Sequence, residues 1–191
     1  MPGLLGRKVG MTRVKSKEGT LVPVTLVLVE TVEIVQVKTV EKDHYQAVVL
    51  GAEKLKHPSK NHHFHLVKEF KVEELAGVER GQTLGIETLE GVESVTVSAV
   101  SKGKGFQGCV VRHNFSIHPH SHGHKHIRAP GSIGVRKARR TQRGQRLPGH
   151  MGAERVTLKD RPIVQVDVAN KLVAIKGPIP GAMRSPIELK W

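Results

Sequence analysis

The sequence predicts a mainly β protein in which a small closed barrel is interrupted by a long, basic, irregular loop. Residues 1–100 and 153–191 are rich in Val, Leu, Ile and Thr in short extended runs, which predict strands of one β domain. Residues 101–152 contain nine glycines and three prolines and follow neither a helical nor a strand period. A closed barrel is favoured because short antiparallel strands otherwise leave edges that must be protected.

The strands of the β domain are predicted from alternating apolar positions, taken in chain order. Both faces of the run at 22–29 are apolar, so this strand is expected to be buried. Further strands are expected at residues 32–40, 45–50, 83–89 and 94–100, and a hairpin is expected from 163–168 and 172–175. A short helix is expected within residues 57–70. Inside the loop, residues 109–113 are expected to add another short strand.

The charge balance restricts the class of partner. The chain has 31 Lys and Arg against 17 Asp and Glu, a net charge of +14, which predicts attraction to a polyanion. No run approaches the roughly 18–20 apolar residues of a membrane span, and the first twelve residues do not resemble a signal peptide. A soluble intracellular or organellar protein that binds nucleic acid rather than a membrane is therefore expected. The single cysteine, Cys109, excludes an internal disulfide and a cysteine zinc site.

The positive charge is concentrated in the middle of the chain. Residues 94–153 contain eleven Lys or Arg and no Asp or Glu. Seven of the eleven are Arg, whose guanidinium groups bind phosphates bidentately and stack on bases. Such a segment cannot bury enough apolar surface to fold alone, and RNA would supply the missing free energy by counterion release. A disordered basic tail is the alternative, but this segment is internal and has spaced apolar residues such as Phe106 and Leu147.

Five histidines alternate along residues 118–126, and a fully extended chain would place them on one side, where Zn or Ni could bind. No metal or cofactor is predicted, because Pro119 and Gly123 disrupt a strand and no nearby carboxylate can orient an imidazole. The same missing carboxylates argue against an enzyme and a small-molecule substrate. The GKGFQG run at 103–108 is only a weak phosphate-loop match, since nucleotide motifs need a strand, the loop and then a helix.

Several motifs together resemble the family of large-subunit ribosomal protein three in its bacterial or organellar form. They cover nearly the whole chain: LLGRKVGMT at 4–12, LVPVTLV at 21–27, SKGKGFQG at 101–108, VVRHNF at 110–115, SHG at 121–123, APGSIG at 129–134, GHMG at 149–152, ERVT at 154–157 and DVANKLVAIKGPIPG at 167–181. The sequence departs from many bacterial members at His150, where they have a glutamine.

The resemblance implies a fold, a location and partners. It implies a six-stranded closed barrel of the translation-protein type (1–100 plus 153–191) with a loop (101–152) that enters ribosomal RNA toward the peptidyl transferase centre. It also implies early binding during assembly, contacts with neighbouring large-subunit proteins, and a place in a cytoplasmic or organellar ribosome. The RNA-binding residues that it implies are Arg7, Lys8, Arg13, Lys102, Lys104, Arg112, His113, Asn114, His122, Lys125, Arg128, Arg136, Lys137, Arg139, Arg140, Arg143, Arg146, His150 and Arg155.

Three hypotheses follow: a structural ribosomal protein, a free-standing RNA-binding module or chaperone, and a histidine-rich protein that handles metal. Sedimentation with large subunits through high salt separates the first two, and chelation of divalent metal tests the third.

Overall fold

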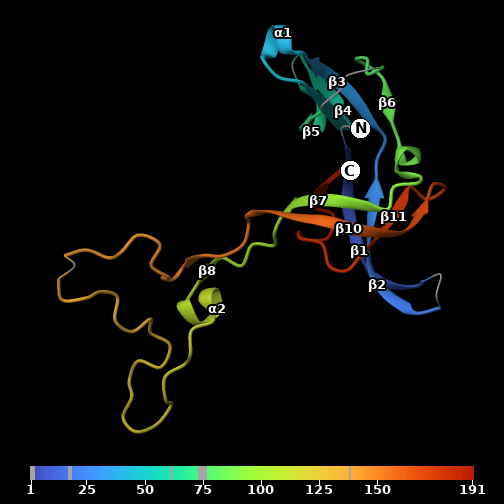
Figure 1. The fold of residues 1–191 in the computed structure, drawn as a ribbon. Helices are drawn as coiled ribbons and strands as arrows, with labels where there is room; N and C mark the ends of the chain where they lie inside the picture. Colours follow the sequence, from blue (N-terminus) through green and yellow to red (C-terminus); the bar gives the residue numbers. More distant parts are fainter. Residues whose placement is uncertain (1–2, 17–18, 61, 73–76, 138) are drawn as a thin grey trace. The chain divides into compact units, whose positions relative to one another are not determined.

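The computed structural model describes residues 3–16, 19–60, 62–72, 77–137 and 139–191. The chain divides into two compact units, unit 1 (Met1–Ser101 and Arg155–Trp191) and unit 2 (Lys102–Glu154). Strands form most of the regular structure of the described residues, so the prediction of a mainly β protein is confirmed (Figure 1).

Six strands of unit 1 are hydrogen-bonded in an order that closes on itself: β1, β12, β7, β10, β11 and β2, all antiparallel (Figure 1). Their bounds are β1 Leu4–Lys15, β2 Leu21–Val29, β7 Ser94–Val100, β10 Arg155–Asp167, β11 Leu172–Lys176 and β12 Pro186–Lys190. The strands expected at 22–29, 94–100 and 172–175 are confirmed. The long strand β1 was not predicted as a strand, since glycines and basic residues interrupt its apolar pattern.

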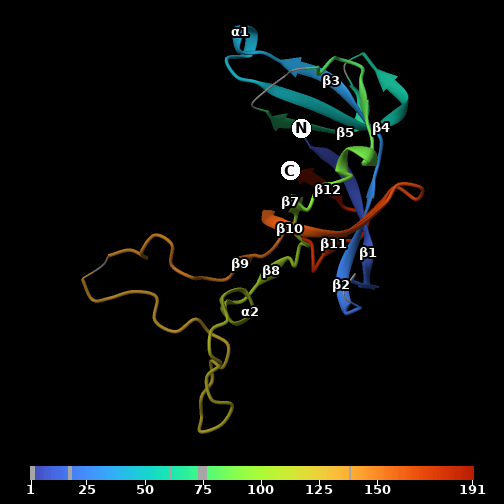
Figure 2. The same ribbon diagram turned by 45° about the vertical axis from the view of Figure 1, so that its right-hand side comes forward.

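Unit 1 also contains a four-stranded sheet in the order β5, β4, β3, β6, of which Figure 2 labels β3, β4 and β5. The bounds are β3 Val32–Lys38, β4 Ala47–Ser59, β5 His62–Lys71 and β6 Thr83–Leu84, with a helical turn α1 at Val40–Asp43 and a 3-10 turn η1 at Ile86–Leu89. The strand expected at 83–89 is thus confirmed only at its first residues. A separate second sheet was not anticipated.

The helix expected within residues 57–70 is wrong, because the described part of this stretch belongs to strands β4 and β5. Phe64 and Phe70 are buried and Leu66 is half-buried, with exposed residues between them. This spacing of two is the strand period. Pairing with the buried part of β4 therefore makes this segment a strand. Its histidines obscured the alternation of apolar residues in the sequence.

One apolar core joins the closed strands and the four-stranded sheet of unit 1. Leu4 from β1, Val32 from β3, Leu50 from β4 and Leu189 from β12 are fully buried in the same cluster. Thr25 is the buried polar side chain of the described core, and its Oγ1 donates to the Gly177 carbonyl at 2.7 Å. Strand β2 is buried at its second half and exposed at its start, so the expectation of complete burial holds only in part.

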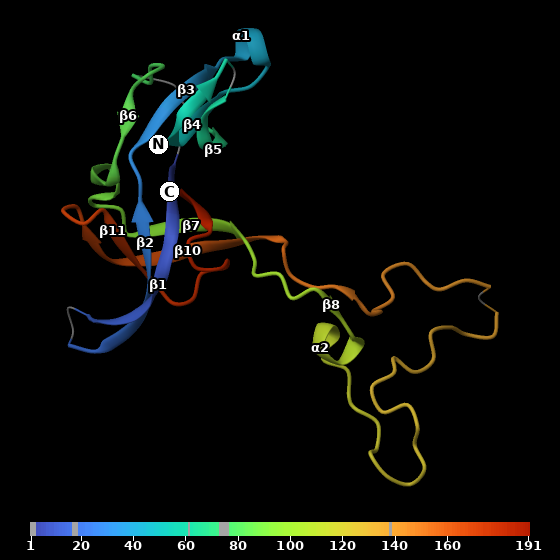
Figure 3. The same ribbon diagram turned by 180° about the vertical axis from the view of Figure 1, so that it is seen from behind.

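Unit 2 has little regular structure. It contains strands β8 (Phe106–Gln107) and β9 (Gly149–His150) and the helix α2 (Cys109–His113), and Figure 3 shows α2 next to β8. The described residues between α2 and β9 contain neither helix nor strand. The strand expected at 109–113 is therefore wrong, although Cys109 is buried as expected. Two consecutive valines favour a strand locally, but contacts with residues 146 and 147 hold this turn as a helix.

Candidate nucleic-acid interface

We call residues 102–115 and 146–154 the stem of unit 2, because they pair with one another. In the two-stranded ribbon, Phe106 lies opposite His150 and Gln107 opposite Gly149. Next to the ribbon, the Lys104 amide donates to the Met151 carbonyl at 2.9 Å, and the Met151 amide donates to the Gly105 carbonyl at 2.9 Å. The stem therefore has a backbone ladder of its own.

Helix α2 fastens the two sides of the stem. Arg112 Nη1 donates to the Leu147 carbonyl at 2.9 Å, and His113 Nε2 lies 3.1 Å from the same oxygen. The Arg112 guanidinium also lies against Gly149, where a Cβ would come within 2.6 Å of Nη1. Two residues that the resemblance assigns to RNA thus make intramolecular contacts that shape the stem, and neither is fully exposed.

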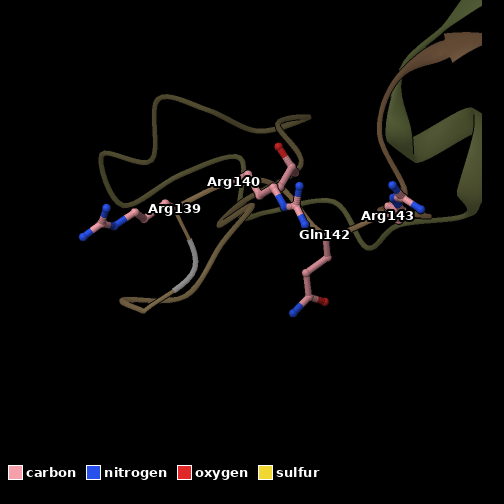
Figure 4. Close-up of a pocket in the computed structure, with 5 residues that line it drawn as sticks. Arg139, Arg140, Gln142 and Arg143 are labelled. Atoms are coloured by element: carbon pink, nitrogen blue, oxygen red, sulfur yellow. The ribbon is translucent and has the colours of Figure 1, made fainter.

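We call residues 116–145 the arm, and it carries most of the positive charge of unit 2. Arg139, Arg140, Thr141, Gln142 and Arg143 line an open hollow of about 530 Å³. Figure 4 shows Arg139 and Arg143 at opposite ends of this segment with Arg140 and Gln142 between them. The guanidinium groups are spread along the chain and do not converge on one point. This arrangement suits a series of phosphates along a backbone better than one small anion.

The cations of unit 2 have no acidic partner among the residues that the structure describes. Ten of the eleven Lys and Arg are exposed, the exception being the half-buried Arg112. The ion pairs formed between described residues all lie in unit 1. The predicted residues Lys102, Lys104, Asn114, His122, Lys125, Arg128, Arg136, Lys137, Arg139, Arg140, Arg143, Arg146 and His150 are all exposed. Unit 2 therefore presents uncompensated positive charge.

The histidine-rich stretch is not extended. His122 (φ 60°) and Gly123 (φ 75°) turn the chain, so that the His118 amide donates to the Ile127 carbonyl at 3.0 Å. The rings of His118 and His124 stack with their centroids 4.8 Å apart. The five imidazoles therefore do not form the row that a fully extended chain would give, and the turn includes Gly123, which the sequence indicated as a break in a strand. Within the described part of the chain, no three metal-ligating side chains are grouped closely enough to hold an ion.

The four site residues predicted in unit 1 differ in their surroundings. Arg7 is hydrogen-bonded to both carboxylate oxygens of Glu53, with Nη2 at 2.6 Å from Oε2, and this lowers the pKa of Glu53. Lys8 Nζ donates to the Ile179 and Gly181 carbonyls at 2.6 and 3.1 Å.

The two other predicted residues of unit 1 are exposed. Arg155 is hydrogen-bonded to Glu188, whereas Arg13 shows an exposed side chain near the end of β1. Arg7 and Lys8 therefore use their donors largely within the protein. Of the four, Arg13 is the residue best placed to offer its charge to a partner.

Sequence reasoning did not include Phe106 among the site residues. Its side chain is 76% exposed, the largest value for a large apolar side chain among the described residues. The sequence did contain a signal for Phe106 as a site residue. It is an aromatic residue inside a glycine-rich basic segment, in a chain with only 3% aromatics. Its exposure, however, depends on the pairing of β8 with β9.

Comparison with known proteins identifies the family. The family described as Ribosomal protein L3 matches residues 74–177. The chain is 39% identical to the large ribosomal subunit protein uL3 of Shouchella clausii, covering 98% of this chain and 96% of the relative. It belongs to the ribosomal protein L3 family. The uL3 proteins of Heliobacterium modesticaldum and Bacillus cytotoxicus are 42% and 40% identical, each over 98% of this chain and 95% of the relative.

Membership in the ribosomal protein L3 family makes the chain a structural ribosomal protein rather than an enzyme, and it agrees with the predicted location in the ribosome. None of the helices in the described residues has the length and apolar character needed to cross a bilayer.

Proposed function

We propose that the protein is a structural constituent of the large ribosomal subunit that binds ribosomal RNA through unit 2. The observation that carries this proposal is the set of eleven Lys and Arg in unit 2, ten of them exposed and none paired with a described acidic residue. Folded proteins normally intersperse both signs of charge on their surface. A continuous polyanion supplies the missing negative charge, and the relatives named as large-subunit proteins indicate which polyanion this is.

The finer form of the proposal assigns a role to each unit. Residues 1–100 and 153–191 form a barrel of the translation-protein type, a proposal that the closed order of six strands in unit 1 supports. Residues 101–152 form a loop that enters the RNA toward the peptidyl transferase centre. The exposed cations and His150 contact phosphates and bases. The protein also contacts neighbouring large-subunit proteins. The resemblance implies that the protein binds early in assembly. Early binding also suits a loop that needs RNA around it.

The RNA-binding proposal is tested by titrating the full chain with transcribed bacterial large-subunit ribosomal RNA, with small-subunit RNA as the control. If about five phosphates are neutralised, affinity should fall roughly 10²- to 10³-fold between 50 and 200 mM salt. Affinity should also be higher for the large-subunit RNA. Equal affinity for both RNAs at all salt concentrations would favour a general RNA-binding module.

The assignment to the large subunit is tested separately, by sedimentation of the chain expressed in a bacterium. The protein should travel with large subunits through a high-salt gradient, because contacts buried inside folded RNA are screened much less than surface contacts. Recovery in the free protein fraction at high salt would support the alternative of an RNA chaperone that visits the ribosome.

A further inference from the structure

The two faces of the β8–β9 ribbon have different surroundings. Successive residues of a strand point to opposite faces, whereas directly paired residues of two strands share a face. Gly149 therefore belongs to the face that the Arg112 guanidinium covers, because a Cβ on Gly149 would come within 2.6 Å of Arg112 Nη1. Phe106 and His150 are paired, so their side chains share the opposite face, and both are exposed.

Phe106 is not explained by packing. Its ring is 76% exposed, and the ring–ring contacts among the described residues are His113 with Phe115 and His118 with His124. Leaving an aromatic side chain in water forgoes burial that is worth about 1.5–3 kcal/mol. The backbone beneath it is nevertheless fixed on both sides by the stem hydrogen bonds. The backbone that carries the ring is therefore held in a defined place, while the ring itself is uncovered.

We propose that Phe106 is a stacking platform for an unpaired nucleobase of RNA, which the backbone of the stem presents before RNA binds. The proposal rests on the proposed RNA-binding function and names the chemical group that this part of unit 2 recognises. Single-stranded and looped RNA is bound by stacking its bases on aromatic side chains, with nearby cations holding the phosphates.

Charge decides between a nucleobase and an apolar protein partner. Lys102 and Lys104 precede Phe106 and are exposed, the cross-strand partner His150 is exposed, and no acidic residue occurs between residues 94 and 153. A protein interface is usually depleted of charged residues around its apolar centre. An exposed aromatic ring that follows two exposed lysines in the chain and is paired with a histidine instead suits a base attached to its phosphates. Preorganisation by the stem lowers the entropy lost on binding.

The test compares two probes of equal charge, oligoadenylate of about twelve nucleotides and an abasic ribose-phosphate oligomer of the same length. The wild-type chain is expected to prefer oligoadenylate. Phe106→Ala should reduce affinity for oligoadenylate about 5- to 100-fold, the range for losing one stacked base, and leave affinity for the abasic oligomer unchanged. Because no charge is removed, the salt dependence should stay the same. Phe106→Trp should retain the preference, and its fluorescence should be quenched by oligoadenylate but not by the abasic probe.

The matched control is Met183→Ala, which removes an apolar side chain of similar exposure (73%) from unit 1 and should leave both affinities unchanged. Circular dichroism should show the same fold for all variants, since position 106 is exposed. Salt-dependent binding without a preference for bases, or a preference that survives Phe106→Ala, would overturn the stacking proposal and leave the RNA-binding function intact. A wild-type chain that binds neither probe nor ribosomal RNA would instead refute the proposed function itself.

Discussion

The two units differ in whether their cationic side chains are paired with carboxylates. In unit 1, cationic side chains form ion pairs with carboxylates. Arg7 pairs with Glu53, and Lys38 Nζ lies 2.5 Å from Glu69 Oε2. Lys68 and Arg155 both pair with Glu188. In unit 2, the cations have no such partner among the described residues, and the exposed arm has few hydrogen bonds. A charge that is compensated inside the protein supports the fold, whereas an uncompensated charge is available to a partner.

This difference between the units distinguishes cationic residues that the composition of the chain does not distinguish. Arg7 and Arg140 are both arginines that the family resemblance assigns to RNA. Arg7 donates to Glu53 and to the Arg184 carbonyl, so its removal should affect stability first. Arg140 lines an exposed hollow, so its removal should affect binding first. The following predictions test this division, from the largest expected effect to the smallest.

The largest effect is expected from replacing Arg136, Arg139, Arg140 and Arg143 together by Ala. If each neutralises one phosphate, the slope of log affinity against log salt should fall in magnitude by up to about 3.6, at roughly 0.9 per phosphate. The measurement is a salt titration with large-subunit ribosomal RNA, and the melting temperature of unit 1 should not change.

The matched control removes four exposed cations from unit 1 by replacing Lys42, Lys56, Lys60 and Arg80 with Ala. The slope of log affinity against log salt should change much less in this control variant than in the variant of unit 2. If both quadruple variants lose the same slope, net charge alone governs binding and the contrast between the units does not hold.

A smaller effect is expected from Gly152→Ala, which acts on the stem. Gly152 has φ +76°, and a Cβ there would overlap the backbone carbonyl oxygen of Lys102. The backbone must therefore shift, at a cost of about 1–3 kcal/mol in local stability. Hydrogen exchange should show faster exchange of the Lys104 and Met151 amides, and the melting temperature of unit 1 should stay constant.

Gly144→Ala is the control for the stem variant, since Gly144 has a similar φ of +77° but open space around it. It should leave exchange of the stem amides unchanged. Unchanged exchange in the Gly152→Ala variant would mean that the stem is not an ordered element in the free protein.

Unit 1 should show a pH-dependent stability that arises from the contact between Arg7 and Glu53. The hydrogen bond from Arg7 lowers the folded-state pKa of Glu53, so ionised Glu53 stabilises the fold above its unfolded pKa of about 4.3. This stabilisation is lost as the pH falls through the lower, folded-state pKa. Glu53→Gln should reduce the free energy of unfolding by about 1–2 kcal/mol at pH 7, and thermal melting should show this difference shrinking below pH 4.

Glu30→Gln is the control of opposite sign. Burial raises the pKa of Glu30, so its ionised form opposes folding at neutral pH. The substitution should be neutral or slightly stabilising at pH 7, with the difference vanishing in acid. Equal destabilisation by both substitutions would show that general repacking, and not the Arg7 ion pair, explains the result.

Local patterns predicted those parts of the molecule in which neighbouring residues decide the structure. The alternation in β7 placed Val95, Val97 and Ala99 on the buried face, and the lack of acidic residues marked the basic middle of the chain. Distant contacts decided the rest. Helix α2 depends on Leu147, 35 positions after Arg112. The exposure of Phe106 depends on its pairing with β9, which no local pattern shows.

The same limit applied to the candidate site. The sequence identified the cations, but could not tell which of them meet a carboxylate inside the protein, because Arg7 and Glu53 are 46 positions apart. Strand β1 was missed for a similar reason, since its glycines break the alternation and its pairing with β2 and β12 establishes it.

The smallest effect is expected from Arg140→Lys, which keeps the charge of the arm and changes only its geometry. The salt slope should equal that of the wild type, because the number of neutralised phosphates is the same. Affinity for large-subunit ribosomal RNA should fall a few-fold, since an ammonium group cannot make the paired hydrogen bonds of a guanidinium fork or stack on a base. The reverse change, Lys137→Arg, is the control at an exposed position of the same arm and should not weaken binding. If Arg140→Lys binds like the wild type while Arg140→Ala binds more weakly, the arm contributes charge alone, and its excess of arginine has no role in fitting the RNA.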